Sequence, residues 1–375
     1  MKIGIDCRIY SSRFTGIGRY VHELVQRVCK NDSKNDYVLF FNEPEFSAFK
    51  SDLPNVKKVL ADAPIYSVRE QLHFLKVLNR EKLDLMHFTH FNAPIFYRRP
   101  SIVTIHDLTL FYYPGRKKKG FVSRVGYDLA FKSAVKKAKK IIAISNNTKN
   151  DLVNLLKTKE SKIRIIYQAV GNEFKKINDE NSIDGTLDRL GIQKPFLLYT
   201  GVWRLHKNVP NLIKAFGEIK NEYGVNELQL VITGKEDPFY LEPKYLPKEL
   251  GVEKDVILPG LVSEIDLINL YNAAEIYVFP SLYGGFGLPP LEAMACETPV
   301  AASNISSIPE VCGKGNAVYF NPHDYKDMAI KIYALYKDKN LQQKLIENGR
   351  ERVKNFSWDR MAEETLELYK LCLYK

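Results

Sequence analysis

Short hydrophobic runs alternate with longer amphipathic segments along most of the chain. In the first half, five such runs indicate buried strands, at residues 2–5, 37–41, 85–88, 102–105 and 140–144. The segments between them place apolar residues three and four positions apart, which is typical of helices with one buried face. This alternation predicts an α/β fold in which a parallel sheet is covered by helices on both faces.

The alternation pauses once and then starts again. Residues 171–186 are polar, have glycines near both ends and show little periodicity, so we expect an interdomain linker there. Five more strand-like runs follow, at 196–200, 228–233, 256–258, 276–279 and 299–302, and an amphipathic helix is predicted at 358–374. The pattern therefore predicts two α/β domains, 1–172 and 187–357, with a cleft between them.

The composition is that of a folded globular protein. The chain has 375 residues, of which 45% are hydrophobic and 26% charged, and this excludes a disordered or fibrous protein. No run approaches about 18 apolar residues and no signal-peptide core is seen, so neither a membrane span nor a leader is expected. Five scattered cysteines without a CxxC pair favour free thiols. We expect a cytoplasmic protein.

Two motifs of the first domain follow predicted strands. Residues 15–20 read TGIGRY, in which Gly16 and Gly18 allow a ligand to approach the backbone at a helix amino terminus, a place that favours anions. A simple tight turn is the alternative interpretation. His106 follows the strand at 102–105, and open α/β sheets bind ligands at the carboxyl ends of their strands. A buried structural histidine is the alternative there.

A basic turn opens the second domain. Arg204 and Lys207 follow the strand at 196–200 in the sequence GVWRLHKN, and a helix is expected to begin near Pro210. Two cations beside a glycine turn suit a pyrophosphate, because arginine offers a planar fork and lysine a point charge. The alternative is a solvated basic turn.

The richest motif follows the strand at 276–279. Residues 280–295 read PSLYGGFGLPPLEAMA, with three glycines among four positions that leave backbone N–H groups open to an oxyanion. A helix that begins near Pro289 directs its positive end toward the same place. Glu292 is expected in its first turn, where it either binds ribose hydroxyls or simply stabilises the helix.

Four blocks in this order resemble family 4 of the retaining glycosyltransferases, which have the GT-B fold. They are TGIGRY at 15–20, IHDL at 105–108, GVWRLHKN at 201–208 and GGFGLPPLEAMACETPV at 284–300. The resemblance implies two Rossmann-like domains facing across a cleft, with the acceptor mainly on the first and the nucleotide sugar mainly on the second. It also implies that the final helix, 358–375, packs back onto the first domain.

The resemblance assigns roles to individual residues. The backbone at Gly16 and Gly18 would lie near the donor phosphate, and His106 near the donor sugar. The diphosphate would be held by Arg204 and Lys207, which with His106 form the catalytic set, and the ribose by Glu292. The other implied donor contacts are Val262 at the base and the loop residues Gly285, Phe286, Gly287 and Leu288.

The chain departs from the family pattern at one position. The family usually has Glu-x7-Glu, but Gly284 stands where the first glutamate is expected. That carboxylate commonly contacts hydroxyls of the donor sugar in relatives. Its absence leaves the donor open and keeps an alternative: a catalytically inactive homologue that binds nucleotide sugar or glycan without transfer.

The predicted function is retaining transfer of a hexose to a saccharide or a lipid-linked saccharide, in surface polysaccharide synthesis. The favoured donor is GDP-mannose and the alternative is a UDP-hexose. No Asp-x-Asp motif occurs, and the two cations and a helix amino terminus can counter the charge of the leaving diphosphate. We therefore expect no metal and no cofactor besides the co-substrate.

Positive charge is concentrated in one segment. Residues 114–140 hold ten basic residues and one acid, and so carry +9 of the net +11. The segment also has an apolar face, to which residues such as Val125, Leu129 and Ala134 contribute. A basic amphipathic helix of this kind is typical of docking on an anionic membrane, here the inner membrane face. The cluster expected to dock the acceptor or the membrane is Arg116, Lys117, Lys118 and Lys119. A solvated helix face is the alternative, and nucleic acid is not expected as a partner.

Overall fold

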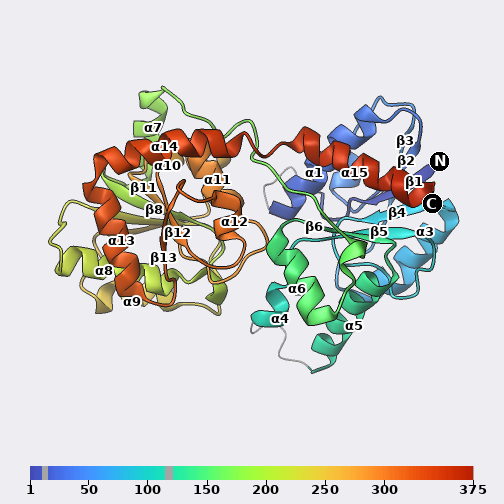
Figure 1. Cartoon of the computed structure of the whole chain (residues 1–375), viewed down its shortest axis with the longest axis horizontal. Helices are drawn as coiled ribbons and strands as arrows, with labels where there is room; N and C mark the ends of the chain where they lie inside the picture. The colour runs from blue at the N-terminus through green and yellow to red at the C-terminus, as the bar shows by residue number, and fades with distance from the viewer. Residues whose placement is uncertain (11–15, 115–120, 375) are drawn as a thin grey trace. The chain divides into compact units, whose positions relative to one another are not determined.

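The computed structural model describes residues 1–10, 16–114 and 121–374, and these form two compact units. Unit 1 comprises Met1–Gln168 and Ser357–Lys375, and unit 2 comprises Ala169–Phe356. Each unit is a parallel sheet with helices on both faces, as Figure 1 shows for each unit separately.

The sheet of unit 1 has seven parallel strands in the order β3-β2-β1-β4-β5-β6-β7. The strands are β1 (Lys2–Asp6), β2 (Asp36–Phe41), β3 (Val56–Leu60), β4 (Leu85–Phe88), β5 (Ser101–Ile105), β6 (Lys140–Ala143) and β7 (Ile163–Ile165). The five predicted strands are confirmed to within one residue at each end. The pattern misses β3, which carries two exposed lysines, and β7, which is only three residues long; both lie at sheet edges.

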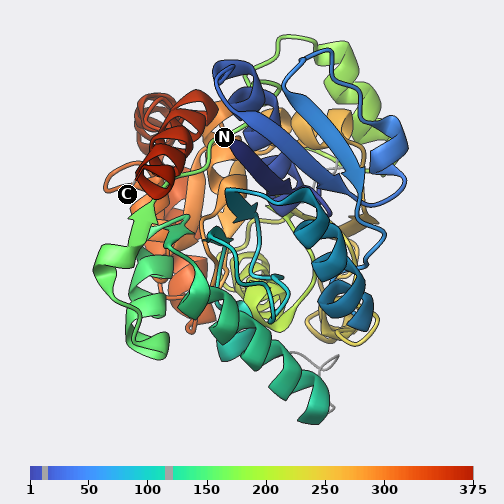
Figure 2. The same ribbon diagram turned by 90° about the vertical axis from the view of Figure 1, so that its right-hand side faces the viewer.

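Helices cover both faces of this sheet. They are α1 (Gly16–Asn31), α2 (Glu45–Ala48), α3 (Leu75–Glu81), α4 (Thr109–Tyr112), α5 (Phe121–Lys137), α6 (Asn146–Leu156) and α15 (Trp358–Leu373), with a π-helical turn at Glu70–Phe74 and a 3-10 turn at Glu160–Lys162. Figure 2 turns unit 1 toward the viewer. One face packs against α3 and α5, through residues such as Leu78 and Phe131. Helix α15 lies beside α1 and contacts β4.

Polar side chains cross the sheet on the face that bears α15. The imidazole of His87 lies between Tyr369 Oη at 2.7 Å and Thr104 Oγ1 at 2.8 Å. Thr104 Oγ1 is in turn 2.9 Å from the hydroxyl of Tyr20 on α1. All four side chains are buried, so the C-terminal helix is tied to the centre of the sheet as well as packed on it.

Unit 2 contains a six-stranded parallel sheet in the order β10-β9-β8-β11-β12-β13. The strands are β8 (Phe196–Thr200), β9 (Gln229–Thr233), β10 (Val256–Gly260), β11 (Ile276–Phe279), β12 (Val300–Ser303) and β13 (Val318–Phe320). All five predicted strands are confirmed with small shifts of their ends, and only the three-residue edge strand β13 escapes the pattern.

The helices of unit 2 are α7 (Glu180–Leu190), α8 (Val209–Asn221), α9 (Glu242–Glu249), α10 (Glu264–Ala273), α11 (Leu288–Ala295), α12 (Ile308–Cys312), α13 (Tyr325–Lys337) and α14 (Lys339–Val353), with a 3-10 turn at Leu205–Lys207. Helices α8 and α13 contribute to the main core, as do alternate residues of β8 and β11 such as Tyr199 and Val278.

The expected linker at 171–186 is wrong over its last seven residues. Asp179 caps α7 by accepting a hydrogen bond from the backbone N–H of Ser182, and Ile183 and Leu187 of this helix are buried. The chain enters unit 2 at Ala169, so the whole stretch belongs to that unit. The two apolar positions that mark the buried face of α7, Ile183 and Leu187, lie four residues apart in an otherwise polar segment. Two such positions are too weak a signal to predict a helix.

We predict that protonation of His87 destabilises the protein in acid. Burial lowers the pKa of this imidazole from 6.5 to about 3. Because the folded-state pKa lies below that of the unfolded chain, the stability due to neutral His87 is complete above about pH 6.5 and is lost as the pH falls toward 3. One proton corresponds to a loss of about 1 kcal/mol per pH unit in the free energy of unfolding.

Urea unfolding of the full chain at pH 7 and pH 5 measures this loss. His87→Gln keeps hydrogen-bonding groups but does not titrate, so its free energy of unfolding should fall less between the two pH values. His323→Gln, at an exposed position of unit 2, is the control and should follow the wild type. Equal pH dependence in all three proteins would contradict the prediction.

Candidate functional site

The strand order of unit 2 reverses direction between two neighbouring strands. From β8 the chain proceeds outward to β9 and β10, whereas from β11 it proceeds the other way to β12 and β13. The loops that follow β8 and β11 therefore diverge onto opposite sides of the sheet. Open α/β sheets bind ligands at the carboxyl edge, at a reversal of this kind. These loops, 201–208 and 280–287, contain two of the motifs singled out in the sequence.

The two loops are joined by hydrogen bonds. The backbone N–H of Leu282 donates to His206 O at 2.8 Å. The side-chain amide of Asn208 donates to Pro280 O at 3.1 Å and to Pro322 O at 2.7 Å. Asn208 is buried and has φ +60°, and α8 begins at the next residue. The position of the basic turn relative to the glycine-rich loop is thus fixed by one backbone hydrogen bond and by the side-chain amide of Asn208.

The basic turn presents two cations. Arg204 is exposed, and the ammonium of the half-buried Lys207 lies 5.5 Å from the centre of the Phe279 ring at the end of β11. His206 between them is buried. Burial lowers its pKa to about 3, and the charges of Lys207 and Arg204 add to this, so the imidazole is neutral at physiological pH. The turn therefore contributes Arg204 and Lys207, and not His206, as charges.

The glycine-rich loop leads directly into α11. Gly287 has φ +116° and immediately precedes this helix, as the sequence predicts for a helix that begins near Pro289. The hydroxyl oxygen of Ser307 lies 2.9 Å from Gly284 O and 2.8 Å from Phe286 O. These contacts occupy carbonyl oxygens of the loop, so the segment after β12 helps to hold its conformation.

Glu292 lies in the second turn of α11 and not in the first, which corrects the sequence-based expectation. The hydroxyl of Tyr271 on α10 donates to its Oε2 at 2.9 Å. Val262 is half-buried and follows β10, next to Leu261, which is 79% exposed. Gly285, Phe286, Gly287 and Leu288 occupy the loop and the start of α11. The predicted donor residues of unit 2 all lie on segments that follow β8, β10 and β11.

The predicted residues of unit 1 have a different character. Gly16 is exposed at the start of α1, and Gly18 is buried two residues before Tyr20. The ring of Tyr20 meets that of His106 edge-on, with centres 5.0 Å apart. His106 itself is only 4% exposed. Its Nε2 lies 2.9 Å from Thr89 O and its Nδ1 lies 3.1 Å from the side-chain amide of Gln168. Burial lowers its pKa, so the neutral form is favoured.

Unit 1 has its own reversal of strand order, between β1 and β4, and polar residues gather there that the motifs do not reveal. Arg8 is buried and forms ion pairs with Asp6 at 2.7 Å and Glu70 at 2.9 Å. After β4, the Nε2 of His90 lies 3.3 Å from the hydroxyl of Tyr66, a residue with φ +61°. Asp6 and Arg8 are two residues apart, but Tyr66, Glu70 and His90 come from distant parts of the sequence, and no spacing rule connects the two groups.

The expected docking cluster, Arg116, Lys117, Lys118 and Lys119, lies outside the described residues. The neighbouring helix α5 is described, and four residues of it form a stripe at helical spacing. They are Val125, Leu129, Lys132 and Lys136, and all are exposed. The sequence pattern places Val125 and Leu129 on the apolar face of this segment; the buried face is instead made by residues such as Tyr127 and Phe131.

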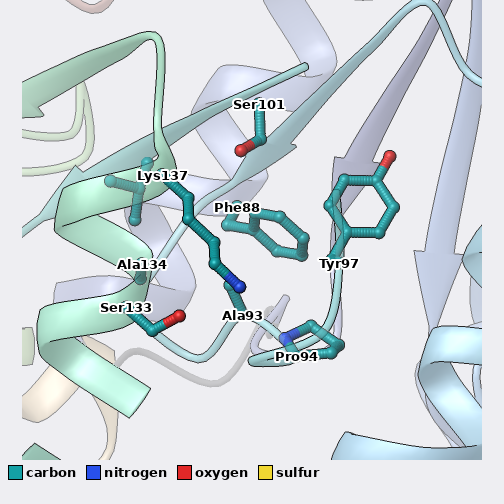
Figure 3. A pocket seen from close by; sticks show the side chains of 9 residues that line it. Phe88, Ala93, Pro94, Tyr97, Ser101, Ser133, Ala134 and Lys137 are labelled. Atoms are coloured by element: carbon teal, nitrogen blue, oxygen red, sulfur yellow. The ribbon is translucent and has the colours of Figure 1, made fainter. Parts of the chain in front are cut away.

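Two cavities within the units do not coincide with the predicted site. One lies in unit 1 between α5 and strands β4 and β5, and Figure 3 shows Lys137 and Tyr97 on opposite sides of its Phe88 ring. Its volume of about 10 Å³ corresponds to roughly one water molecule. The other, about 300 Å³, is an open groove of unit 2 between the last turns of α8, Leu250 and Tyr325.

Two protein-family models match the chain. The model "Glycosyltransferase Family 4" matches residues 14–173, and "Glycosyl transferases group 1" matches residues 188–352. The chain belongs to the family 4 glycosyltransferases. Together the two matches account for most of the chain, and the division between them falls close to the boundary between the two units.

Curated relatives and solved structures agree with this assignment. Serotype-specific mannosyltransferase WbdA of Escherichia coli is 32% identical over 62% of this chain, which spans only 28% of that protein. O-antigen chain mannosyltransferase B of E. coli is 27% identical over 99% of this chain and all of its own length. The structure of Anabaena HepE in complex with UDP and glucose matches 99% of both chains with a TM-score of 0.77 at 18% identity. The fold is therefore GT-B.

Two properties of the described residues bear on ligands and membranes. Across residues 1–10, 16–114 and 121–374, histidines, cysteines and carboxylates nowhere gather in threes in a way that suits a metal ion. Among the same residues, no helix has both the length and the apolar character needed to cross a membrane.

We predict that a side chain is tolerated at position 284. A Cβ built on Gly284 meets no atom within 4 Å, whereas one on Gly234 meets Gly201 O at 2.1 Å, and Gly234 also has φ +134°. Gly284→Glu should change the free energy of unfolding by no more than about 0.5 kcal/mol, whereas Gly234→Ala should cost about 2 kcal/mol or more. Urea unfolding of both variants tests this, and equal losses would contradict it.

Proposed function

We propose that this glycosyltransferase moves a hexose from a nucleoside-diphosphate sugar to a saccharide acceptor with retention of anomeric configuration. One observation carries the proposal. Arg204 and Lys207 lie on the loop that is hydrogen-bonded to the glycine-rich loop, at the point where the sheet of unit 2 reverses its strand order. That place combines positive charge, backbone N–H groups and a helix amino terminus.

These groups suit the chemistry of a leaving diphosphate. Breaking the bond between sugar and phosphate leaves negative charge on the diphosphate oxygens, and groups fixed in advance around them lower the barrier. Arg204 offers a planar fork of donors and Lys207 a point charge, while α11 directs the positive end of its dipole toward the loop. We propose that this charge compensation makes a metal or other cofactor unnecessary.

The proposed donor is GDP-mannose, and the alternative is a UDP-hexose. The mannosyltransferase names of the E. coli relatives support the first, and the UDP bound to HepE, a far more distant relative, supports the second. In both cases Glu292 binds the ribose and the segment at Val262 meets the base. His106 beside the donor sugar stays a prediction. Burial favours its neutral form, in which Nε2–H donates to Thr89 O and Nδ1 accepts from the Gln168 amide, so the imidazole does not act as a charged acid.

The proposed acceptor is a saccharide or lipid-linked saccharide of surface polysaccharide synthesis, as the names of the relatives support. We place it on unit 1, at the carboxyl edge of the sheet. There Tyr66 exposes 56% of its surface beside the imidazole of His90 and the ring of Phe91. Aromatic faces flanked by hydrogen-bonding groups suit sugar rings, which have apolar and polar surfaces.

We predict that Lys207→Ala weakens binding of the donor diphosphate. The substitution removes one charge-assisted contact, worth about 1.5–3 kcal/mol, so the Kd should rise about 10- to 100-fold. Isothermal calorimetry of the full chain with GDP, UDP, GDP-mannose and UDP-glucose measures this and identifies the base. Lys331→Ala, at an exposed position of α13, is the matched control and should bind like the wild type.

Two results would contradict the proposal at different levels. Binding that Lys207→Ala leaves unchanged would remove the diphosphate role from Lys207. Donor binding without either transfer or hydrolysis would favour the inactive homologue, for which Gly284 is the specific observation. If product forms, NMR of its anomeric proton with the donor as reference tests retention.

We further propose that unit 1 docks on an anionic membrane surface through α5, the long blue-green helix at the lower edge of Figure 2. Its exposed stripe combines the apolar Val125 and Leu129 with the cationic Lys132 and Lys136. In a membrane interface, apolar side chains enter the acyl boundary and lysines bind anionic headgroups, and this exposed stripe offers both. A lipid-linked acceptor would be presented at such a surface.

We predict that reversing two charges of this stripe reduces membrane binding. Lys132→Glu with Lys136→Glu removes attraction of about 1 kcal/mol per lysine and adds repulsion, so partition onto vesicles containing phosphatidylglycerol should fall at least about 10-fold. Lys331→Glu with Lys344→Glu changes the net charge equally on unit 2 and is the control. Co-sedimentation measures both, and an equal loss in the two variants would reject a specific role of α5.

A further inference from the structure

Three hydroxyl groups form a buried chain that ends on Glu292. Tyr277 is on β11, Thr200 ends β8, Tyr271 is on α10, and Glu292 is on α11. Thr200 Oγ1 lies 3.1 Å from the hydroxyl of Tyr277 and 3.0 Å from that of Tyr271. The hydroxyl of Tyr271 lies 2.9 Å from Glu292 Oε2. Four elements of unit 2 thus contribute one link each.

The hydrogen bonds of this hydroxyl chain can run in only one consistent donor-to-acceptor direction. An ionised carboxylate can only accept hydrogen bonds, so Tyr271 donates its one proton to Glu292. The hydroxyl of Tyr271 must then accept from Thr200, and Thr200 must accept from Tyr277. Burial raises the pKa of both phenols, and the charge of Glu292 adds to this, so both keep the protons that the chain requires. Hydrogen bonds aligned in this way strengthen one another.

Tyr271 is fixed at several points. Its side chain is fully buried, its backbone oxygen accepts a hydrogen bond from the Thr298 hydroxyl, and its ring meets that of Phe174 edge-on with centres 5.9 Å apart. Glu292, in contrast, is half-buried on the second turn of α11. A flexible glutamate at the border of solvent is thus tethered to a rigid phenol.

We propose that Tyr271 is a positioning residue, which holds the carboxylate of Glu292 in the orientation that accepts the ribose hydroxyls of the nucleotide. A carboxylate has about four acceptor sites, so the contact with Tyr271 leaves acceptor capacity for a ligand. Nucleotide binding then costs less entropy, because the contact with Tyr271 already restricts the side-chain rotamers of Glu292 in the free protein. The inference rests on the proposed function, in which Glu292 binds ribose.

A purely structural role for the hydroxyl chain predicts a different outcome. If the chain only satisfied buried polar groups, its removal would lower stability and would affect all nucleotides equally. A positioning role affects only the contact with the ribose hydroxyls. Comparing a ribonucleotide with its 2′,3′-dideoxy form therefore separates the two roles, and the ratio of the two affinities does not depend on the fraction of folded protein.

The experiment is calorimetry of the full chain with whichever of GDP and UDP binds the wild type more tightly, and with its 2′,3′-dideoxy form. The wild type should prefer the ribonucleotide. Tyr271→Phe keeps the ring and removes the hydroxyl; its Kd for the ribonucleotide should rise about 5- to 10-fold, while its Kd for the dideoxy form changes less than 2-fold. Thr200→Val, which breaks the chain one link further away, should give a smaller change in the same direction.

Tyr199→Phe is the matched control. Tyr199 is also a fully buried tyrosine of unit 2, adjacent to Thr200, but its hydroxyl has no hydrogen-bond partner within the described part of the chain. This variant should retain the wild-type preference for the ribonucleotide. It reports the general cost of replacing a buried tyrosine by phenylalanine close to the site.

Other results of this experiment would overturn either the proposed function or the inference about Tyr271. Wild-type protein that binds neither GDP nor UDP overturns the proposed function, and the inference with it. Wild-type protein that binds ribo and dideoxy forms equally shows that Glu292 does not bind ribose, which overturns the inference. A wild-type preference that Tyr271→Phe retains in full leaves the proposed function standing and shows that Tyr271 does not position Glu292.

Discussion

The side-chain amide of Asn208 holds the candidate site of unit 2 together. It is buried at the junction between the basic turn and α8, and it donates to backbone oxygens of the segments after β11 and β13. Pro322 O also accepts from the Asn211 amide at 3.2 Å, whereas loss of the Asn208 contact to Pro280 O in a buried place would cost about 1–3 kcal/mol. The same amide therefore stabilises three loops and fixes the distance between the cations and the glycine-rich loop.

The groups of the candidate site are held in place mostly by other residues, which do not themselves face a ligand. Ser307 holds two carbonyl oxygens of the glycine-rich loop, and Tyr271 holds the carboxylate of Glu292. Preorganisation of this kind is expected where charge must be stabilised quickly, because a fixed dipole needs no reorganisation during the reaction. On the proposed function, ligand binding in unit 2 thus depends on residues of α10 and of the segment after β12 as well as on the residues that face the ligand.

The sequence predicts those parts of the site that follow strands directly. Strand ends are marked by short apolar runs, so Arg204, Lys207 and Gly287 could be placed at the carboxyl edge without a structure. Tyr271 could not, because it reaches the site from an element that carries no motif and only tertiary packing brings it there. The partners of His106 are likewise invisible in the sequence, since Thr89 and Gln168 lie 17 and 62 residues away.

Gly284 lies in a loop whose conformation is set by other residues. The loop conformation is imposed by Ser306 and Ser307 and by the left-handed Gly287, so it does not require a carboxylate at position 284. Relative to the family pattern, the missing glutamate leaves one negative charge fewer beside the two cations. On the proposed function, attraction of the diphosphate is then stronger, while recognition of the sugar hydroxyls is weaker. Discrimination between donors therefore shifts toward the base and the ribose, which is the part of the nucleotide that the hydroxyl chain behind Glu292 serves.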